Sequence, residues 1–277
     1  QLNSYLDFCV DVFGDDFYIE IAPSTNPEQI YCNRRIINVA RAFGIKMIYV
    51  TSDLHGYSLE KIKEMFSKVG FSDDDFCFVL GDVIDRGKDG IEILKWLMTK
   101  PNMELILGNH EAMMLACEFL FDEITEESIS KITGNKLDIY LLWEQNGARP
   151  TINALHSLEP NEIKYILEYL HEAPLYETVS VNGKDFLLTH SGLKNFDKNK
   201  SISKYSNEDF LWNRPKIDDR YFDDVITVFG HTPTIYYGEE YKGKAVVTDT
   251  WIDIDTGASC GFSPMLLRLD DLKEFYF

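Results

Sequence analysis

Six side chains that could bind a divalent metal come directly after apolar runs of the sequence. They combine carboxylate, amide and imidazole groups: Asp53, His55, Asp82, Asn109, His190 and His231. This mixture suits borderline or hard divalent ions such as manganese, iron or zinc. A lone Asp-x-His or Gly-His pattern is more often a turn or a hydrogen-bonded polar residue, but here such patterns follow one apolar run after another. The sequence therefore predicts a metal site.

Charged groups that could act on a phosphate stand beside these potential ligands. Asp85 and Arg86 belong to the run Gly81-Asp82-Val83-Ile84-Asp85-Arg86-Gly87, and His110 belongs to Gly108-Asn109-His110-Glu111. Glycines let the backbone approach a ligand closely, and a planar guanidinium can bind two phosphoryl oxygens at once. Asp85 and Arg86 could instead simply pair at a helix start. Because the whole motif is present, we predict a metal-assisted phosphate site.

The apolar runs that precede the first motifs are typical of buried strands. Ile45–Thr51, Phe76–Leu80 and Met103–Leu107 each end at a polar motif. Apolar residues at helical spacing lie between them, over Leu59–Val69 and Ile91–Met98. Ligands of open α/β sheets bind at the carboxyl ends of the strands. We therefore expect an α/β fold in which the motifs meet at one edge.

The later part of the chain supplies the two remaining histidines of the set. The pattern over residues 111–176 is mainly helical, and we expect it to form a cap or rim over the site. Asn182-Gly183 between two strand-like runs is a strong hairpin signal, and the second run ends at His190. Val225–Phe229 is a further buried strand that ends just before His231. Short strands with Gly and Pro turns are expected from there on.

Composition and charge limit the class of protein. There are 27 basic and 46 acidic side chains, a net charge of −19, and such a surface repels nucleic acid and anionic membranes. No apolar run is long enough to span a bilayer, and the first positive side chain is Arg34, so a signal peptide is not expected. The five cysteines are scattered without a close pair, which favours reduced thiols. We predict a cytoplasmic protein with no nucleic-acid or membrane partner.

Together the motifs resemble those of the metal-dependent phosphoprotein phosphatases. That family has Gly-Asp-x-His-Gly, Gly-Asp-x-x-Asp-Arg-Gly and Gly-Asn-His-Glu, followed by two later histidines before small residues. This chain has, in the same order, Ser52-Asp53-Leu54-His55-Gly56, Gly81 to Gly87, Gly108 to Glu111, His190-Ser191-Gly192 and Gly230-His231. The likeness is greatest to the bacterial and phage branch of these calcineurin-like metallophosphoesterases. It implies an α/β fold with a central β-sandwich flanked by helices.

The resemblance also implies two divalent metal ions. Asp53 and His55 would hold the first ion, Asp82 would bridge, and the second ion would be held by Asn109, His190 and His231. Manganese is the expected metal, with iron or zinc as alternatives. The implied reaction is in-line attack of a metal-bridging hydroxide on phosphorus, without a phosphoenzyme.

The same resemblance assigns the groups that contact the substrate. Arg86 and Arg214, with Asn109 beside them, would bind the phosphoryl oxygens, and the Arg214 assignment depends on a short Trp-x-Arg-Pro match. His110 would protonate the leaving alkoxide, oriented and kept cationic by Asp85. Glu111 is expected to hold its loop rather than to bind metal.

Two parts of the chain depart from the family pattern. Ser52 replaces its first glycine, for which we expect a local adjustment only. Residues 1–46 are expected to form a short βαβ-like extension before a catalytic domain of residues 47–277. They resemble a fragment of the PHP domain of the bacterial DNA polymerase III alpha subunit. The rest of the chain lacks the ligands of that domain, so we expect a fused remnant and no polymerase activity.

Three functions are compatible with parts of this residue pattern. The leading prediction is hydrolysis of phosphomonoesters on protein serine or threonine, with tyrosine left open as a third acceptor. The alternative is a hydrolase of dinucleoside polyphosphates such as diadenosine tetraphosphate, whose family shares this scaffold. That family typically has Gly-Asn-His-Asp and lacks the second aspartate of the arginine motif, so Glu111 and Asp85 favour the phosphoprotein branch. A non-catalytic binding protein is disfavoured because every expected ligand is present. The expected partner is a phosphorylated protein or peptide, and the sequence predicts no oligomeric state.

Overall fold

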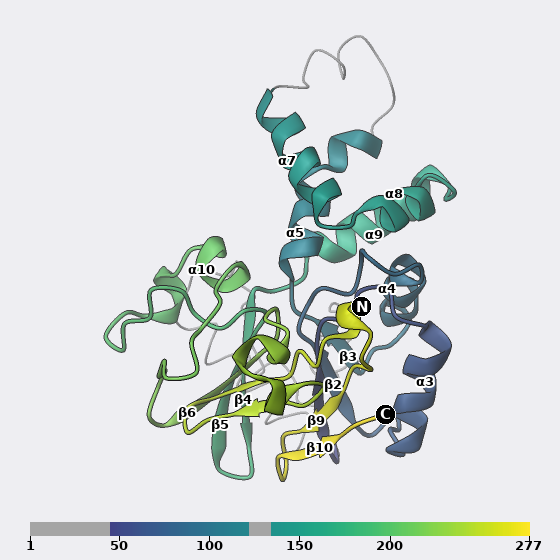
Figure 1. Cartoon of the computed structure of the whole chain (residues 1–277). Helices are drawn as coiled ribbons and strands as arrows, with labels where there is room; N and C mark the ends of the chain where they lie inside the picture. The colour runs from purple at the N-terminus through teal and green to yellow at the C-terminus, as the bar shows by residue number, and fades with distance from the viewer. Residues whose placement is uncertain (1–44, 122–133) are drawn as a thin grey trace, which may run out of the picture.

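Two five-stranded β-sheets pack face to face in the computed structural model, which describes residues 45–121 and 134–277 (Figure 1). The first sheet has the order β10-β9-β1-β2-β3, with β1 Ile48–Thr51, β2 Phe76–Val79, β3 Met103–Leu105, β9 Leu266–Arg268 and β10 Lys273–Phe275. The second has the order β4-β5-β6-β8-β7, with β4 Tyr176–Val181, β5 Lys184–Thr189, β6 Val225–Phe229, β7 Val246–Val247 and β8 Trp251–Asp253.

Both sheets mix parallel and antiparallel strands. In the first sheet β1, β2 and β3 are parallel, and β9 and β10 add antiparallel neighbours. In the second sheet β5, β6 and β8 are parallel, and β4 and β7 are antiparallel to their neighbours. Six strands are therefore parallel to a neighbour, and the polar motifs follow the carboxyl ends of such strands. The expected α/β sandwich is confirmed.

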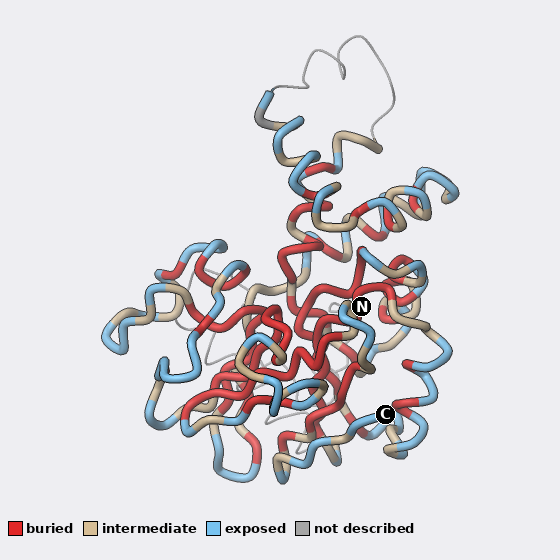
Figure 2. Tube along the Cα trace, in the orientation of Figure 1, coloured by how far each residue is buried: buried red, intermediate tan, exposed pale blue. Residues whose placement is uncertain are grey.

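The alternation of side chains along each strand places the core. Ile48 and Val50 of β1 face the second sheet, whereas Tyr49 between them faces the outer helices. Successive side chains of a strand point to opposite faces, so strands that are apolar at every position must be covered on both sides. Phe186 and Leu188 of β5 meet the first sheet from across the sandwich. Figure 2 shows the buried segments gathered in this interior.

Helices cover the outer face of the first sheet. They are α3 Leu59–Lys68 and α4 Gly90–Met98, which lie beside β1, β2 and β3 (Figure 1). Helix α3 begins at Ser58, whose hydroxyl accepts a hydrogen bond from the Lys61 amide at 3.4 Å. The buried residues Ile62 and Phe66 of α3 face the core, as the helical spacing predicts.

A helical excursion stands above one end of the sandwich (Figure 1). It comprises α5 Asn109–Ala116, η1 Glu118–Phe121, α7 Gly134–Gln145, α8 Arg149–Leu155 and α9 Pro160–His171. The outer face of the second sheet carries shorter elements: η2 Ile202–Lys204, α10 Asn207–Leu211, η3 Thr234–Tyr237 and η4 Glu239–Tyr241. A last short element, η5 Ala258–Cys260, lies between β8 and β9 in the chain. The mainly helical pattern expected between Glu111 and Tyr176 is confirmed for the described residues.

Most predicted elements are found within one or two residues of their expected bounds. The hairpin turn is formed by Asn182 and Gly183, with φ of 52° and 78°, as expected for this pair. Residues 1–44, which hold most of the predicted βαβ-like extension, lie outside the described residues. No helix in the described parts of the chain is long and apolar enough to cross a membrane.

Replacing Thr227 with valine is expected to raise the free energy of unfolding by about 1 kcal/mol. Thr227 in β6 is fully buried, and no partner for its hydroxyl is found among the described residues. Valine keeps the branched shape and removes the cost of burying an unpaired hydroxyl. Urea denaturation of both proteins measures the difference, and a less stable valine variant would contradict the prediction.

Candidate metal and phosphate site

Strand ends from both sheets deliver the predicted site residues to one place. Asp53 and His55 follow β1 and Asp82 follows β2, while Asn109 begins α5 shortly after β3. In the second sheet, His190 follows β5 and His231 follows β6 directly after Gly230. All of these side chains are buried: Asp53, His55, Asp82, Asn109, His190 and His231. The structure thus brings together the six residues that the sequence predicted as ligands.

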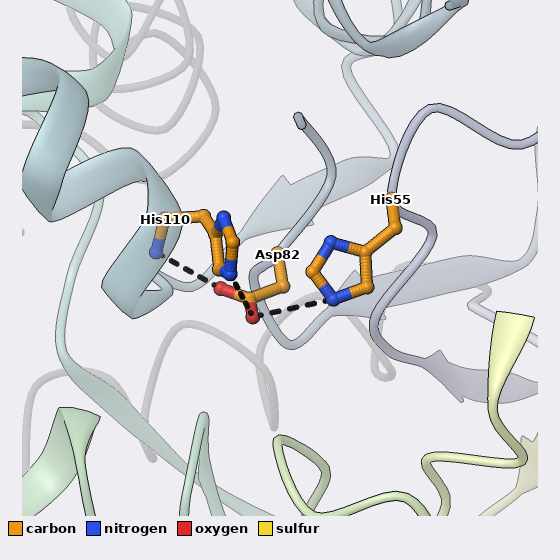
Figure 3. A group of neighbouring side chains, drawn as sticks. All are labelled: His55, Asp82 and His110. Atoms are coloured by element: carbon orange, nitrogen blue, oxygen red, sulfur yellow. Dashed lines mark hydrogen bonds and ion pairs between the residues drawn. The ribbon is translucent and has the colours of Figure 1, made fainter. Parts of the chain in front are cut away.

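Asp82 lies at the centre of the cluster. His55 Nε2 is 3.6 Å and His110 Nε2 is 3.7 Å from Asp82 Oδ2 (Figure 3). On the other side, His190 Nε2 is 3.3 Å from Asp82 Oδ1. Asp82 therefore belongs to two groups whose potential ligand atoms lie within 4.8 Å of one another: His55–Asp82–His110 and Asp82–His190–His231.

The second group also gathers an amide oxygen. Asn109 Oδ1 is 2.8 Å and His231 Nδ1 is 3.2 Å from His190 Nε2. Asp53 extends the first group, because its Oδ1 lies 3.9 Å from His55 Nε2. The same Asp53 carboxylate accepts the His231 amide at 2.8 Å, which ties the β1 and β6 loops together.

Two histidines have their ring orientation fixed by backbone carbonyls. His55 Nδ1 donates to Ile84 O at 3.2 Å, and His190 Nδ1 donates to Leu80 O at 2.7 Å. A carbonyl oxygen can only accept, so Nδ1 carries a proton, and in a ring with a single proton Nε2 then carries the free lone pair. Both Nε2 atoms face Asp82, as metal-binding histidines require.

Two buried polar atoms of the cluster, Asp53 Oδ1 and His231 Nε2, have no hydrogen-bond partner among the described residues. Buried polar atoms are rarely left unpaired, because each costs free energy. Asn109 Oδ1 faces His190 Nε2 at 2.8 Å, and both are acceptors in the tautomer whose only proton is on Nδ1. Acceptors that converge without donors fit a cation, so this donor set fits divalent metal ions.

The charge states favour the same conclusion. Burial raises the pKa of the Asp82 carboxyl well above its usual value, and the charges of Asp53 and Glu111 raise it further. Burial also raises the pKa of Asp53. It lowers the pKa of His55 and of His231 well below the usual value. Burial thus favours the neutral form of His55 and His231, the form that binds metal, and a divalent cation would relieve the repulsion between carboxylates.

The backbone of the loops adopts conformations that are costly for ordinary residues. Six predicted site residues have φ between 41° and 70°: Asp53, His55, Asp82, Asp85, Arg86 and His231. Such left-handed conformations persist only where the surroundings impose them, and they cluster at functional sites. Gly81 and Gly108 lie back to back, and a Cβ on Gly81 would be 2.5 Å from Gly108 Cα. Glycine at these positions lets the β2 and β3 loops meet.

His110 pairs with Asp85 beside the cluster. Its Nδ1 donates to Asp85 Oδ2 at 2.6 Å, and its Nε2 accepts from Arg86 Nη2 at 3.1 Å. Burial, followed by the charge of Arg86, lowers the pKa of His110. Asp85 was expected to orient His110 and to keep it cationic. The hydrogen bond to Asp85 orients the ring, whereas burial and the guanidinium act against a second proton in the metal-free protein. The cationic state stays a prediction.

The arginines border the cluster on two sides. Arg86 reaches His110, whereas Arg214 Nη1 donates to His231 O at 3.0 Å. Both arginine side chains are exposed, so their remaining donors are open to a ligand. Ser52, which departs from the family pattern, donates its hydroxyl to the Asp53 carboxylate. The adjustment at Ser52 is local, as expected.

Four residues near the site were missed by the sequence analysis. Trp143 and Thr151 of the helical excursion contact the Asp85 carboxylate. Asp253 and Asp255 lie at the end of β8, fully or almost fully buried. The run Trp251-Ile252-Asp253-Ile254-Asp255 alternates apolar and acidic residues before Thr256-Gly257, a signal that could have found the two aspartates.

This fold and this donor set define a class: metal-binding phosphoesterases built on a two-sheet sandwich. Residues 46–258 match the family model of the calcineurin-like phosphoesterases. The chain belongs to that family.

Relatives within the family differ in substrate. The chain is 26% identical over 217 residues to serine/threonine-protein phosphatase 2 of Salmonella typhimurium, covering 77% of this chain and 88% of that protein. It is 22% identical over 194 residues to a symmetrical bis(5'-nucleosyl)-tetraphosphatase of Buchnera aphidicola, covering 64% and 60%. A solved structure of a putative diadenosine tetraphosphatase superposes with a TM-score of 0.56 at 15% identity, covering 84% of this chain and 93% of that one. That likeness shows the fold.

A short segment of the chain matches a different kind of protein. Over 56 residues it is 41% identical to a probable DNA polymerase of Bacillus subtilis, covering 20% of this chain and 4% of the polymerase. A match of this extent does not support a PHP domain here, and the predicted PHP likeness of residues 1–46 is corrected accordingly. The chain spans only 4% of the length of that relative.

Proposed function

We propose that residues 47–277 form a phosphatase that uses two divalent metal ions to hydrolyse phosphomonoesters on protein serine or threonine, with tyrosine as a third acceptor. One observation carries the proposal: Asp82 belongs to both groups of potential ligands, as a carboxylate that bridges two ions must. The expected partner is therefore a phosphorylated protein or peptide. Manganese is the proposed metal, with iron or zinc as alternatives that the same ligands accept.

The ligand set divides around Asp82. Asp53 and His55 would hold one ion, and Asn109, His190 and His231 the other. When bound, the ions would supply an activated water and neutralise charge on the phosphoryl group. Ile84 O and Leu80 O hold the rings of His55 and His190 with Nε2 toward Asp82, so these nitrogens would be available to the ions.

The arginines bind the substrate phosphate. Arg86 and Arg214 approach from opposite sides and would take the non-bridging oxygens, where guanidinium donors form paired hydrogen bonds. A phosphate that draws Arg86 toward itself would also remove the guanidinium from His110 Nε2. Loss of that contact and the incoming negative charge both favour a proton on His110.

His110 supplies the proton for the leaving oxygen. Its Nε2 faces the cluster at 3.7 Å from Asp82 Oδ2, and Asp85 holds its Nδ1. A serine or threonine alkoxide is a poor leaving group, so a positioned acid accelerates its departure by a factor of about 10² to 10⁴. An aryl phosphate with a good leaving group needs that proton much less.

A second candidate function is hydrolysis of dinucleoside polyphosphates. It is favoured by the tetraphosphatase relatives, whose similarity extends over 64% of the chain in one case. Glu111 and Asp85 favour the phosphoprotein function, since the motifs of the rival family typically lack them. The two functions share a metal centre and differ in what surrounds the phosphate.

Metal removal is expected to abolish activity, and manganese to restore it. Purified protein stripped with a chelator is assayed on a phosphothreonine peptide, p-nitrophenyl phosphate and diadenosine tetraphosphate, with manganese, zinc or magnesium added back. Manganese-dependent cleavage of the peptide supports the proposal, and His110→Ala should slow it by about 10²-fold. Preference for the dinucleotide would move the assignment to the second function. No turnover with any metal would overturn both.

A further inference from the structure

The Asp85 carboxylate is held by two side chains that lie outside the loop motifs. Thr151 Oγ1 donates to Asp85 Oδ1 at 2.6 Å, and Trp143 Nε1 donates to Asp85 Oδ2 at 2.8 Å. Thr151 belongs to α8 and Trp143 to α7, so both come from the helical excursion above the sandwich. The excursion therefore contributes donors to the group that orients His110.

Both carboxylate oxygens and the backbone N–H of Asp85 are hydrogen-bonded. Its Oδ2 also accepts His110 Nδ1 at 2.6 Å. The Thr151 hydroxyl, while it donates to Oδ1, accepts the backbone N–H of Asp85 at 3.0 Å. Each carboxylate oxygen thus has a donor, and backbone and side chain are fixed together. A carboxylate that accepts several hydrogen bonds is held both in charge and in orientation.

The surrounding packing keeps this arrangement in place. The exposed fraction is 1% or less for each of Trp143, Asp85 and His110. Water therefore cannot replace a missing donor without a rearrangement. The turn between α7 and α8 also holds Arg86, the residue that follows Asp85. Gly147 O in this turn accepts the Arg86 amide at 2.9 Å. Gly147 has φ of 99°, and a Cβ there would come 2.9 Å from Arg86 Cγ.

We propose that Trp143 and Thr151 are positioning residues for the Asp85–His110 pair, through which the α7–α8 excursion controls protonation of the leaving group. The inference rests on the proposed function for its catalytic consequence. Neither side chain reaches the potential metal ligands through any hydrogen bond of the described structure, so both act through Asp85. Without them the Asp85 carboxylate is free to rotate, and His110 loses the fixed direction of its Nε2.

The kinetic test separates positioning from general damage. Thr151→Val removes the hydroxyl, which is both donor and acceptor, with little change of shape, and Trp143→Phe removes the indole N–H together with part of the ring system. In manganese, kcat on a phosphothreonine peptide is expected to fall about tenfold or more, and kcat on p-nitrophenyl phosphate less than about threefold, with KM unchanged. Thr151→Ser keeps the hydroxyl and should restore the peptide rate. Equal losses on both substrates, or none, would overturn the inference.

Two matched controls come from the second sheet. Thr227→Val removes a buried hydroxyl for which the described residues offer no partner, and Trp251→Phe removes a buried indole N–H that donates to Asp219 O at 2.9 Å. Neither residue contacts Asp85 or His110 in any hydrogen bond of the described structure. Both controls should keep the wild-type ratio of the two rates, and a control that lowers the ratio as much as Thr151→Val does would overturn the inference.

A spectroscopic measurement tests the positioning of His110 without any substrate turnover. Side-chain nuclear magnetic resonance of the metal-free protein is expected to show His110 with a proton on Nδ1 that exchanges slowly with water. In Thr151→Val and Trp143→Phe this signal should move upfield and exchange faster, while Thr151→Ser resembles the wild type. An unchanged signal in both variants would overturn the inference. Wild-type protein inactive on every phosphomonoester would overturn the proposed function, whereas the resonance would still report on positioning.

Discussion

Asp82→Asn is expected to lower kcat at least about a thousandfold on every phosphomonoester tested. Asp82 is shared by both groups of potential ligands, with His55 Nε2 at 3.6 Å and His190 Nε2 at 3.3 Å on its two oxygens. An amide carries no charge and offers only one acceptor atom. Its NH2 group would face an imidazole nitrogen or the space meant for a cation, so one of the two ions loses its bridging ligand.

The effect should appear in metal content as well as in rate. Metal analysis after dialysis is expected to give about two ions per wild-type chain and one or fewer in Asp82→Asn. Asp75→Asn serves as a control, because Asp75 is also buried but accepts the Met47 and Ser72 amides away from the cluster. A variant of Asp82 that keeps both ions and a rate within about tenfold of wild type would exclude Asp82 as the bridging ligand.

The strand-end motifs could be predicted from sequence because their information is local. An apolar run followed within a few residues by a carboxylate or a histidine places the side chain at a strand end, and β1, β2, β5 and β6 all follow this rule. The hairpin at Asn182-Gly183 is equally local, since a left-handed φ is required at both positions. The convergence of the two sheets on one site needed the family resemblance.

Contacts between distant residues could not be predicted in this way. Trp143 is 58 residues and Thr151 is 66 residues from Asp85 in sequence, and neither has a motif around it. The lowered pKa of His110 also has no signal in the sequence, because it depends on burial and on the position of Arg86. The end of β3 was placed two residues too late. Ile106 N still donates to Val79 O, but Leu107 N donates to Pro174 O, so the chain leaves the sheet there.

Glu111→Gln is expected to lower the free energy of unfolding of the metal-free protein by about 3 kcal/mol. Glu111 is fully buried, and its carboxylate accepts four backbone N–H groups. Oε1 accepts Val83 at 2.8 Å and Ile84 at 3.2 Å, while Oε2 accepts Asp82 at 2.8 Å and Gly108 at 3.1 Å. Glu111 thus joins the β2 loop to the start of α5, and no metal need be present for it to do so.

Glutamine fits the space but supplies a single acceptor oxygen. Its NH2 group would face two N–H donors, which leaves buried donors unpaired and pushes the loops apart. Glu162→Gln is the matched control, since Glu162 accepts the Glu159 amide at 3.2 Å in the same position of an exposed helix start. Urea denaturation should show a much smaller change for the control, because its carboxylate is exposed to water beside Lys95. Equal changes in the two variants would mean that Glu111 only caps α5, whereas the larger loss at Glu111 identifies it as the residue that holds the two loops of the site together.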